Sequence, residues 1–128
     1  MNQYSNIPPL NAAAVLKRYG LRADKALGQN FLQDDSALEK IANAAEILKD
    51  DCVLEIGPGL GSLTRYLAVS AQKVTAVELD PDLLAPLKAV LKPYQNVNVV
   101  HGDILKLNIS EIIDQPDYLV VANIPYNI

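Results

Sequence analysis

The chain has 128 residues and a single cysteine; half of its residues are hydrophobic and a fifth are charged, which is the composition of one globular domain. No apolar run approaches the roughly 20 residues of a membrane-spanning helix, and no basic segment followed by an apolar stretch marks a signal peptide. The net charge is −4, yet residues 1–30 carry four basic and one acidic side chain. We therefore expect a cytoplasmic protein without a membrane anchor, with a basic arm on an acidic body.

Residues 1–27 are predicted to form the basic arm, with one helix in it. Leu10 to Tyr19 place alanine, valine and leucine on one face, and Gly20 is a typical residue at which a helix ends. A basic surface can contact a polyanion, so Arg18, Arg22 and Lys25 are candidate contacts to such a partner. The simpler interpretation is that these side chains only face solvent.

Residues 28–128 alternate between helical and strand patterns. Ser36–Glu39 has the form of a capping box that opens a helix, and Asp80-Pro81 is a typical helix start. Pro86 should kink or shorten the helix that follows. The predicted strands are residues 52–54, 73–78, 97–100 and 117–122, with a short helix or turn at 107–113. Such alternation predicts an α/β domain with a parallel sheet, and about four strands indicate an incomplete one.

The stretch Glu55–Gly61 joins the first strand to a helix predicted for residues 62–69. Its glycines at 57, 59 and 61 allow a ligand to approach the backbone closely at the carboxyl edge of the sheet. The alternate spacing differs from the dinucleotide fingerprint, and the carboxylate of Glu55 would repel a pyrophosphate. The pattern therefore favours a cationic ligand such as S-adenosylmethionine over NAD. A glycine-rich turn without a ligand is the simpler alternative.

Two further strand ends carry candidate ligand contacts. Glu78 ends the second strand 21 residues after Gly57, about the separation at which a carboxylate accepts the ribose hydroxyls of a nucleoside. Asp103 follows the third strand and can accept a hydrogen bond from an adenine amino group. His101 beside it is interpreted as a strand-end histidine rather than a catalytic one.

The fourth strand leads into Asn123-Ile124-Pro125-Tyr126. An adenine amino group is a poor nucleophile, and its methylation needs acceptors that hold its hydrogens. The side-chain oxygen of Asn123 and a backbone carbonyl fixed by Pro125 can supply two acceptors, while Tyr126 can stack on an extruded base. No strong base is required. A proline-containing turn after a strand is the alternative.

These motifs together resemble a known family. GQNFL at 28–32, EIGPGLG at 55–61, VELD at 77–80, GD at 102–103 and NIPYNI at 123–128 stand in the order and spacing of the N-terminal half of KsgA-type ribosomal RNA adenine dimethyltransferases. The resemblance covers residues 25–128. It implies a Rossmann-like class I S-adenosylmethionine-dependent methyltransferase fold. It also implies dimethylation of two adjacent adenines near the 3′ end of small-subunit ribosomal RNA, on an immature small ribosomal subunit.

The resemblance also implies roles for individual residues. The cofactor-binding set would be Asn30, Leu32, Glu55, Gly57, Gly59, Gly61, Glu78, Asp103 and Asn123. Asn123, Pro125 and Tyr126 would form the catalytic set, and no metal is implied. The family's later strands, its second aromatic against the target base and its helical C-terminal domain have no counterpart in this sequence. We therefore expect the chain alone not to methylate RNA.

Three alternatives remain open at this point. Erm-type large-subunit ribosomal RNA methyltransferases share the motifs and the chemistry. A non-catalytic module for cofactor binding or ribosome assembly is the second alternative. An NAD-dependent oxidoreductase is the third, and it is disfavoured by the glycine spacing and by Glu55.

Overall fold

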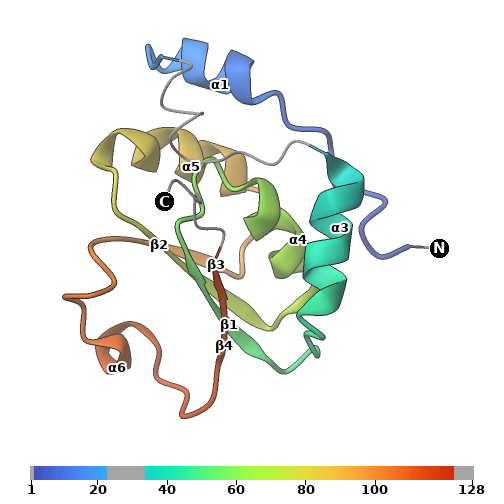
Figure 1. The fold of residues 1–128 in the computed structure, drawn as a ribbon, viewed down its shortest axis with the longest axis vertical. Coiled ribbons are helices and arrows are strands. Elements are labelled where there is room, and N and C mark those ends of the chain that lie inside the picture. Colours follow the sequence, from blue (N-terminus) through green and yellow to red (C-terminus); the bar gives the residue numbers. More distant parts are fainter. Residues whose placement is uncertain (1, 23–33, 123–128) are drawn as a thin grey trace, which may run out of the picture.

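The structure is a computed structural model that describes residues 2–22 and 34–122 (Figure 1). Its centre is a four-stranded sheet in the order β3-β2-β1-β4, and every neighbouring pair of strands is parallel. The strands are β1 Cys52–Ile56, β2 Lys73–Glu78, β3 Val97–His101 and β4 Leu119–Ala122. The predicted α/β class, the parallel sheet and all four strands are confirmed.

The strand order reverses beside β1. The chain moves outward from β1 to β2 and β3, and then returns so that β4 pairs with the free side of β1. Val53 stands opposite Val74 of β2 on one side and Leu119 of β4 on the other. At such a switch point the connections leaving the two strands diverge, which opens a crevice at their carboxyl ends.

Two helices cover one face of the sheet. These helices are α3 (Asp35–Ala44) and α4 (Ser62–Ser70), and their buried Leu38, Leu63 and Leu67 pack with Val53 and Val74 of the sheet. Figure 1 shows both helices on the same side of the strands. Burial of these side chains is the main stabilising contribution on this face.

The segment after β3 covers the other face. It contains the short helix α6 (Ile109–Ile112), and Ile113 packs with Leu54 and Val77 from the sheet. Figure 1 shows α6 on the side of the sheet away from α3 and α4. The turn or short helix predicted at 107–113 is thus confirmed as α6.

The N-terminal helix packs next to the loop that follows β1. This helix, α1 (Ala12–Arg18), buries Ala12 and Leu16 against Leu60 and Leu83. Gly20 adopts a φ of 69°, donates its N–H to Lys17, and ends α1 in a Schellman motif, as predicted from the sequence. The boundary predicted between residues 27 and 28 lies outside the described residues and stays a prediction.

Two helix starts show where local pattern and structure differ. The side chain that caps α3 is Asp34, which accepts the backbone N–H of Ser36, so the predicted start at Ser36 was wrong. Both residue types are good N-caps, so the local pattern alone does not distinguish them. Asp80 caps a 3-10 turn, η1 (Pro81–Leu83), before α5 (Leu84–Leu91) begins. Pro86 therefore stands in the first turn of α5, where a missing N–H costs no hydrogen bond.

Within residues 2–22 and 34–122, no helix combines the length and apolarity needed to cross a bilayer. In the same ranges, no three His, Cys, Asp or Glu side chains are grouped so as to hold a metal ion.

Gly61 offers a test of this packing. A Cβ there would lie 3.1 Å from Cδ1 of Leu87 and 3.2 Å from Cδ2 of Leu91, at a φ of 86°, whereas a Cβ at Gly20 meets nothing within 4 Å. We expect Gly20→Ala to lower the free energy of unfolding by about 1 kcal/mol, from backbone strain alone. Gly61→Ala should cost about 1–3 kcal/mol more because it also overpacks the core. Urea denaturation measures both, and equal losses would contradict this packing.

Candidate functional site

The loop from β1 to α4 is a tight turn that requires glycine. Gly57, Gly59 and Gly61 have φ angles of 72°, 62° and 86°, a region that other residues rarely adopt. The N–H of Gly57 donates to the carbonyl of Val77 at 3.0 Å, which fastens the turn to β2. Leu60, between the last two glycines, is fully buried and anchors the turn. The predicted cradle is therefore present as a compact turn at the carboxyl end of β1.

Glu78 ties the end of β2 to this turn. Its side chain is 2% exposed; Oε1 accepts the N–H of Gly59 at 3.0 Å and Oε2 accepts the N–H of Asp80 at 2.9 Å. Burial raises the pKa of the Glu78 carboxyl, while the backbone hydrogen bonds from Asp80 and Gly59 oppose that rise. The carboxylate predicted beside the glycine turn thus lies in direct contact with it.

Glu55 lies beneath the turn and is enclosed by protein. Its side chain is fully buried, Oε1 accepts the hydroxyl hydrogen of Thr64, and Oε2 has no hydrogen-bond partner. Burial raises the pKa of Glu55 to about 7; the Thr64 hydroxyl lowers it and the nearby Glu78 raises it further. An uncompensated buried carboxylate is unfavourable, so a proton or a nearby cation stabilises this group.

The end of β3 lies next to the end of β2. The strands pair Glu78 with His101, and the N–H of Gly102 donates to the carbonyl of Glu78 at 3.0 Å. Asp103 follows directly; one of its carboxylate oxygens accepts the N–H of Leu105 at 3.0 Å. Nε2 of His101 lies 3.2 Å from the carbonyl oxygen of Leu79. Asp103 and Glu78 are thus carried by adjacent strand ends, as the sequence predicted.

Several predicted site residues lie outside the described residues. They are Lys25, Asn30, Leu32, Asn123, Pro125 and Tyr126. The register of β1 and β4 pairs Ile56 with Ala122, the residue immediately before Asn123. Their roles stay predictions.

Leu79 is a candidate that the sequence argument missed. It stands between Glu78 and Asp80 at the carboxyl edge of the sheet, and 64% of its side chain is exposed. A large exposed apolar side chain directly after the ribose candidate Glu78 suits contact with the flat face of a base. The feature of the sequence that could have identified it is a leucine directly after the last residue of a buried strand.

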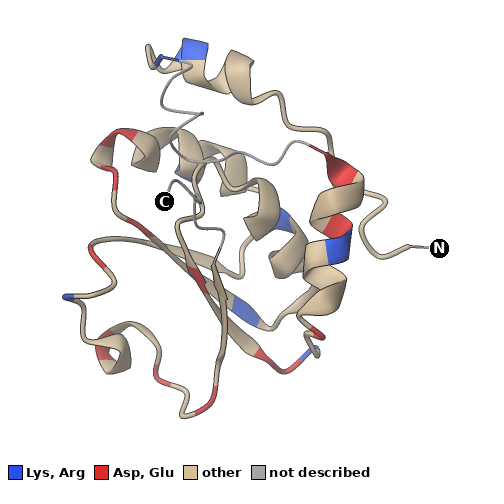
Figure 2. Ribbon diagram, viewed as in Figure 1, with Lys and Arg blue, Asp and Glu red and all other residues tan. Residues whose placement is uncertain are grey.

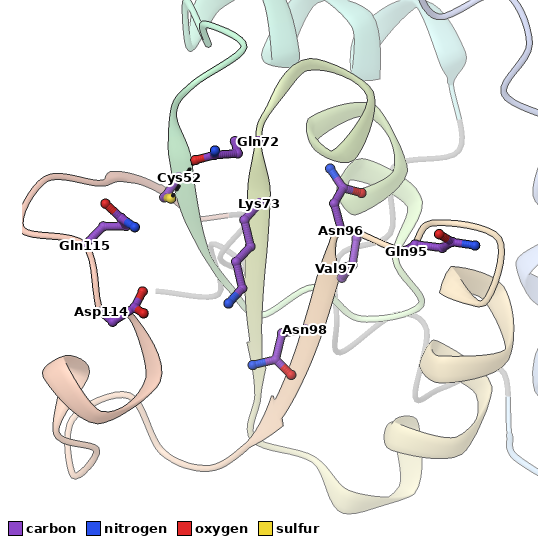
Figure 3. Close-up of a pocket in the computed structure, with 9 residues that line it drawn as sticks. All are labelled: Cys52, Gln72, Lys73, Gln95, Asn96, Val97, Asn98, Asp114 and Gln115. Atoms are coloured by element: carbon purple, nitrogen blue, oxygen red, sulfur yellow. Dashed lines mark hydrogen bonds between the residues drawn. The ribbon is translucent and has the colours of Figure 1, made fainter.

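A cavity of about 720 Å³ lies at the opposite end of the strands (Figure 3). Cys52, Lys73 and Val97, the first residues of β1, β2 and β3, help to line it, together with side-chain amides such as Gln72 and Asn96. The thiol of Cys52 lies 3.9 Å from Oε1 of Gln72. Among the described residues, none of the predicted site residues lines this cavity; Glu55, Glu78 and Asp103 lie at or just after the carboxyl ends of their strands.

The described charges of the basic arm lie at the end of α1. Arg18 and Arg22 are exposed there and just beyond the helix. Figure 2 shows blue at this end of α1, whereas α3 and the segment that carries α6 show both red and blue. The described part of the basic arm is therefore held in place by Ala12 and Leu16 while it presents its charges to solvent.

Comparison with known proteins gives one family. The profile of the family described as ribosomal RNA adenine dimethylase matches residues 20–128. A ribosomal RNA small subunit methyltransferase A from Leuconostoc mesenteroides is 47% identical over 125 residues, which cover 94% of this chain and 42% of that protein. The protein of the same name from Alkaliphilus metalliredigens is 44% identical, over 94% of this chain and 43% of its own length. The chain thus spans about two fifths of the curated relatives that it matches.

Solved structures show the same fold. The crystal structure of the 23S rRNA methyltransferase ErmE matches with a TM-score of 0.67 and 40% identity, over 76% of this chain and 38% of that one. A dimethyladenosine transferase from Plasmodium falciparum matches with a TM-score of 0.62 and 35% identity, over 75% of this chain and 34% of its own. The Rossmann-like methyltransferase fold expected from the sequence is confirmed.

The raised pKa of Glu55 predicts a pH dependence of stability. In the unfolded chain this carboxyl titrates near 4.5 and in the folded protein near 7, so the folded state binds more protons between these values. The free energy of unfolding should therefore fall as pH rises through this window, by up to about 3 kcal/mol. Glu55→Gln should remove much of that slope and be at least as stable as the parent protein above pH 7.

Urea titrations across this window measure the slope, and Glu111→Gln on the exposed surface of α6 is the matched control. A slope that is unchanged in Glu55→Gln would contradict the assignment of a proton to the buried carboxyl.

Proposed function

Because the chain belongs to the ribosomal RNA adenine dimethylase family, we propose that it supplies the cofactor-binding part of an S-adenosylmethionine-dependent RNA methyltransferase. The reaction would be N6,N6-dimethylation of two adjacent adenines near the 3′ end of small-subunit ribosomal RNA, on the immature small subunit in the cytoplasm. The observation that carries the proposal is the glycine turn closed by the buried carboxylate of Glu78.

The side chains around the turn fit this cofactor. The side chains at the carboxyl edge of the sheet are mainly hydrogen-bond acceptors. They are Glu55 and Glu78 at the turn and Asp103 at the next strand end. Such a set suits a nucleoside with hydroxyl and amino donors and a cationic amino-acid part, and it is a poor match for a pyrophosphate. The unpartnered Oε2 of Glu55 is a further sign that a positive charge nearby is favourable.

The proposal assigns a contact with the cofactor to each residue of the site. Each oxygen of a carboxylate has two lone pairs, so Glu78 can hold the backbone of Gly59 and still accept the ribose hydroxyls. Asp103 would accept the adenine amino group, and Leu79 would contact the face of that ring. Gly57 would let the amino-acid part approach the backbone, with Asn30 and Leu32 closing over it.

The cofactor supplies an electrophilic methyl group, and the protein's task is to present the target amino group to it. Asn123 and the carbonyl fixed by Pro125 would accept the amino hydrogens and hold the nitrogen lone pair toward the methyl group. Tyr126 would stack on the extruded base. Ala122, the residue before Asn123 in the sequence, pairs with Ile56 at the end of β1, which supports this assignment.

An Erm-type reaction on large-subunit RNA is the second candidate, supported by the match to ErmE over 76% of the chain. The small-subunit proposal is preferred because the curated relatives named as small-subunit methyltransferases match over 94% of the chain, at 44–47% identity. A non-catalytic assembly module would share the cofactor site and lack methyl transfer.

Glu78 is the residue whose replacement tests the cofactor site. Glu78→Gln removes the charge and one acceptor. We expect the affinity of this variant for S-adenosylhomocysteine to fall at least about tenfold, because about one charge-assisted hydrogen bond is lost. Calorimetric titration measures the affinity, and thermal melting of the unliganded variant reports the structural cost separately. Glu111→Gln is the control and should bind as the parent does. Equal affinities of the two variants would contradict the assignment of Glu78 as the ribose contact.

The basic arm is tested by the salt dependence of RNA binding. Replacing Arg18, Arg22 and Lys25 by Ala should flatten the log–log slope by about 0.7–0.9 for each phosphate contact that is lost. Lys40→Ala with Lys49→Ala, two exposed lysines at α3 and after it, serves as the control. Filter binding to a small-subunit RNA fragment provides the slopes. If the arm variant keeps the parent slope, its side chains only face solvent.

A further inference from the structure

A second cavity lies away from the strand ends. Its volume is about 360 Å³, and it is enclosed by the N-terminal segment before α1, by α4 and by the end of α5. Eight residues of the described ranges line it; six of them are apolar or aromatic, among them Pro9, Val90 and Tyr94, and none is acidic. None of the predicted cofactor or RNA contacts that lie in those ranges lines it.

Arg65 of α4 is the charged residue in this cavity. Its side chain is 3% exposed, Nη1 donates to the carbonyl oxygen of Pro8, and Nε has no hydrogen-bond partner. The guanidinium carbon lies 5.8 Å from the centre of the Tyr66 ring, which stabilises the cation in part. Within the described ranges, no carboxylate forms an ion pair with Arg65. Nε itself is enclosed by protein, so an anion in the cavity would act through the charge of the guanidinium as a whole. A buried guanidinium with no anionic partner is unfavourable, and an anion beside it would stabilise it.

We propose that this cavity binds a small monocarboxylate with an apolar body, whose carboxylate pairs with Arg65 and whose body contacts the apolar wall. The site is additional to the cofactor and RNA sites proposed above and does not depend on them. The volume is in the range of small-ligand pockets, at its lower end.

The chemistry of the lining selects a carboxylate over a phosphate. A phosphate brings up to two charges and at least three oxygens that need donors; among the described lining residues Asn6, Tyr94 and Arg65 carry side-chain donors, and Arg65 is the one cation that could balance the charge. A carboxylate brings one charge and two oxygens, which one guanidinium can satisfy. The walls formed by Pro9, Val90 and Tyr94 then exclude water from the apolar body.

The small number of arginines in the sequence makes this site simple to observe by NMR. The chain has three arginines, at positions 18, 22 and 65. Arg18 and Arg22 are exposed, so the Nε–H signals of these two report non-specific ion pairing in the same NMR spectrum in which Arg65 reports the site. Phenylacetate is the probe; benzyl alcohol, which lacks the carboxylate, and inorganic phosphate are the comparisons.

We expect phenylacetate to shift the Nε–H signal of Arg65 and the amide signal of Tyr94 saturably, with a dissociation constant on the order of 1 mM. The signals of Arg18 and Arg22 should stay in place, and benzyl alcohol should bind at least about tenfold more weakly because the charged contact is lost. Arg65→Met and Val90→Phe, which fills the cavity and keeps the arginine, should both abolish the Tyr94 shift. Lys88→Met, an exposed site on α5, should not.

Three results would overturn the proposal. The first is equal movement of all three arginine signals, and the second is a phenylacetate shift retained in Val90→Phe or Arg65→Met. The third is saturable binding of phosphate in place of phenylacetate, which would make the cavity a phosphate site instead. If Arg65→Met fails to fold, Val90→Phe and the arginine signals of the parent protein decide the question.

Discussion

The bidentate contact of Glu78 is the interaction on which the candidate site depends. One oxygen holds the N–H of Gly59 in the turn after β1, and the other holds the N–H of Asp80 after β2. Because the carboxyl group is 2% exposed, these bonds are made away from water, where leaving either donor unpaired would be costly. The same contact therefore shapes the glycine turn and fixes a carboxylate beside it.

The two buried carboxyl groups give the site its electrostatic character. Glu55 and Glu78 lie near each other, and burial raises the pKa of both. A ligand with a positive charge near the turn would favour their ionised forms, whereas a pyrophosphate would oppose them. The charge preference thus follows from the same residues that build the turn. The Arg65 cavity has the opposite preference, and it lies between other elements of the fold.

Local pattern predicted the strands and the glycine turn because both depend on nearby residues. Lys73–Glu78 reads as a buried strand from its apolar side chains alone, and the positive φ angles at 57, 59 and 61 require glycine. Long-range packing was not visible in the same way. Nothing local indicates that Leu16 of α1 packs on Leu60, or that Glu55 is enclosed with one oxygen unpartnered. The local pattern likewise did not distinguish Asp34 from Ser36 as the cap of α3, because both residue types are good N-caps.

We propose that the edge of the sheet around Gly57, Gly59 and Glu78 is a site for S-adenosylmethionine and not for a dinucleotide. Calorimetric titration of the 128-residue chain with S-adenosylhomocysteine and, separately, with NADH tests it most directly. We expect saturable binding of S-adenosylhomocysteine and no binding of NADH, because the carboxylates oppose the pyrophosphate. Saturable binding of NADH with no binding of S-adenosylhomocysteine would contradict it.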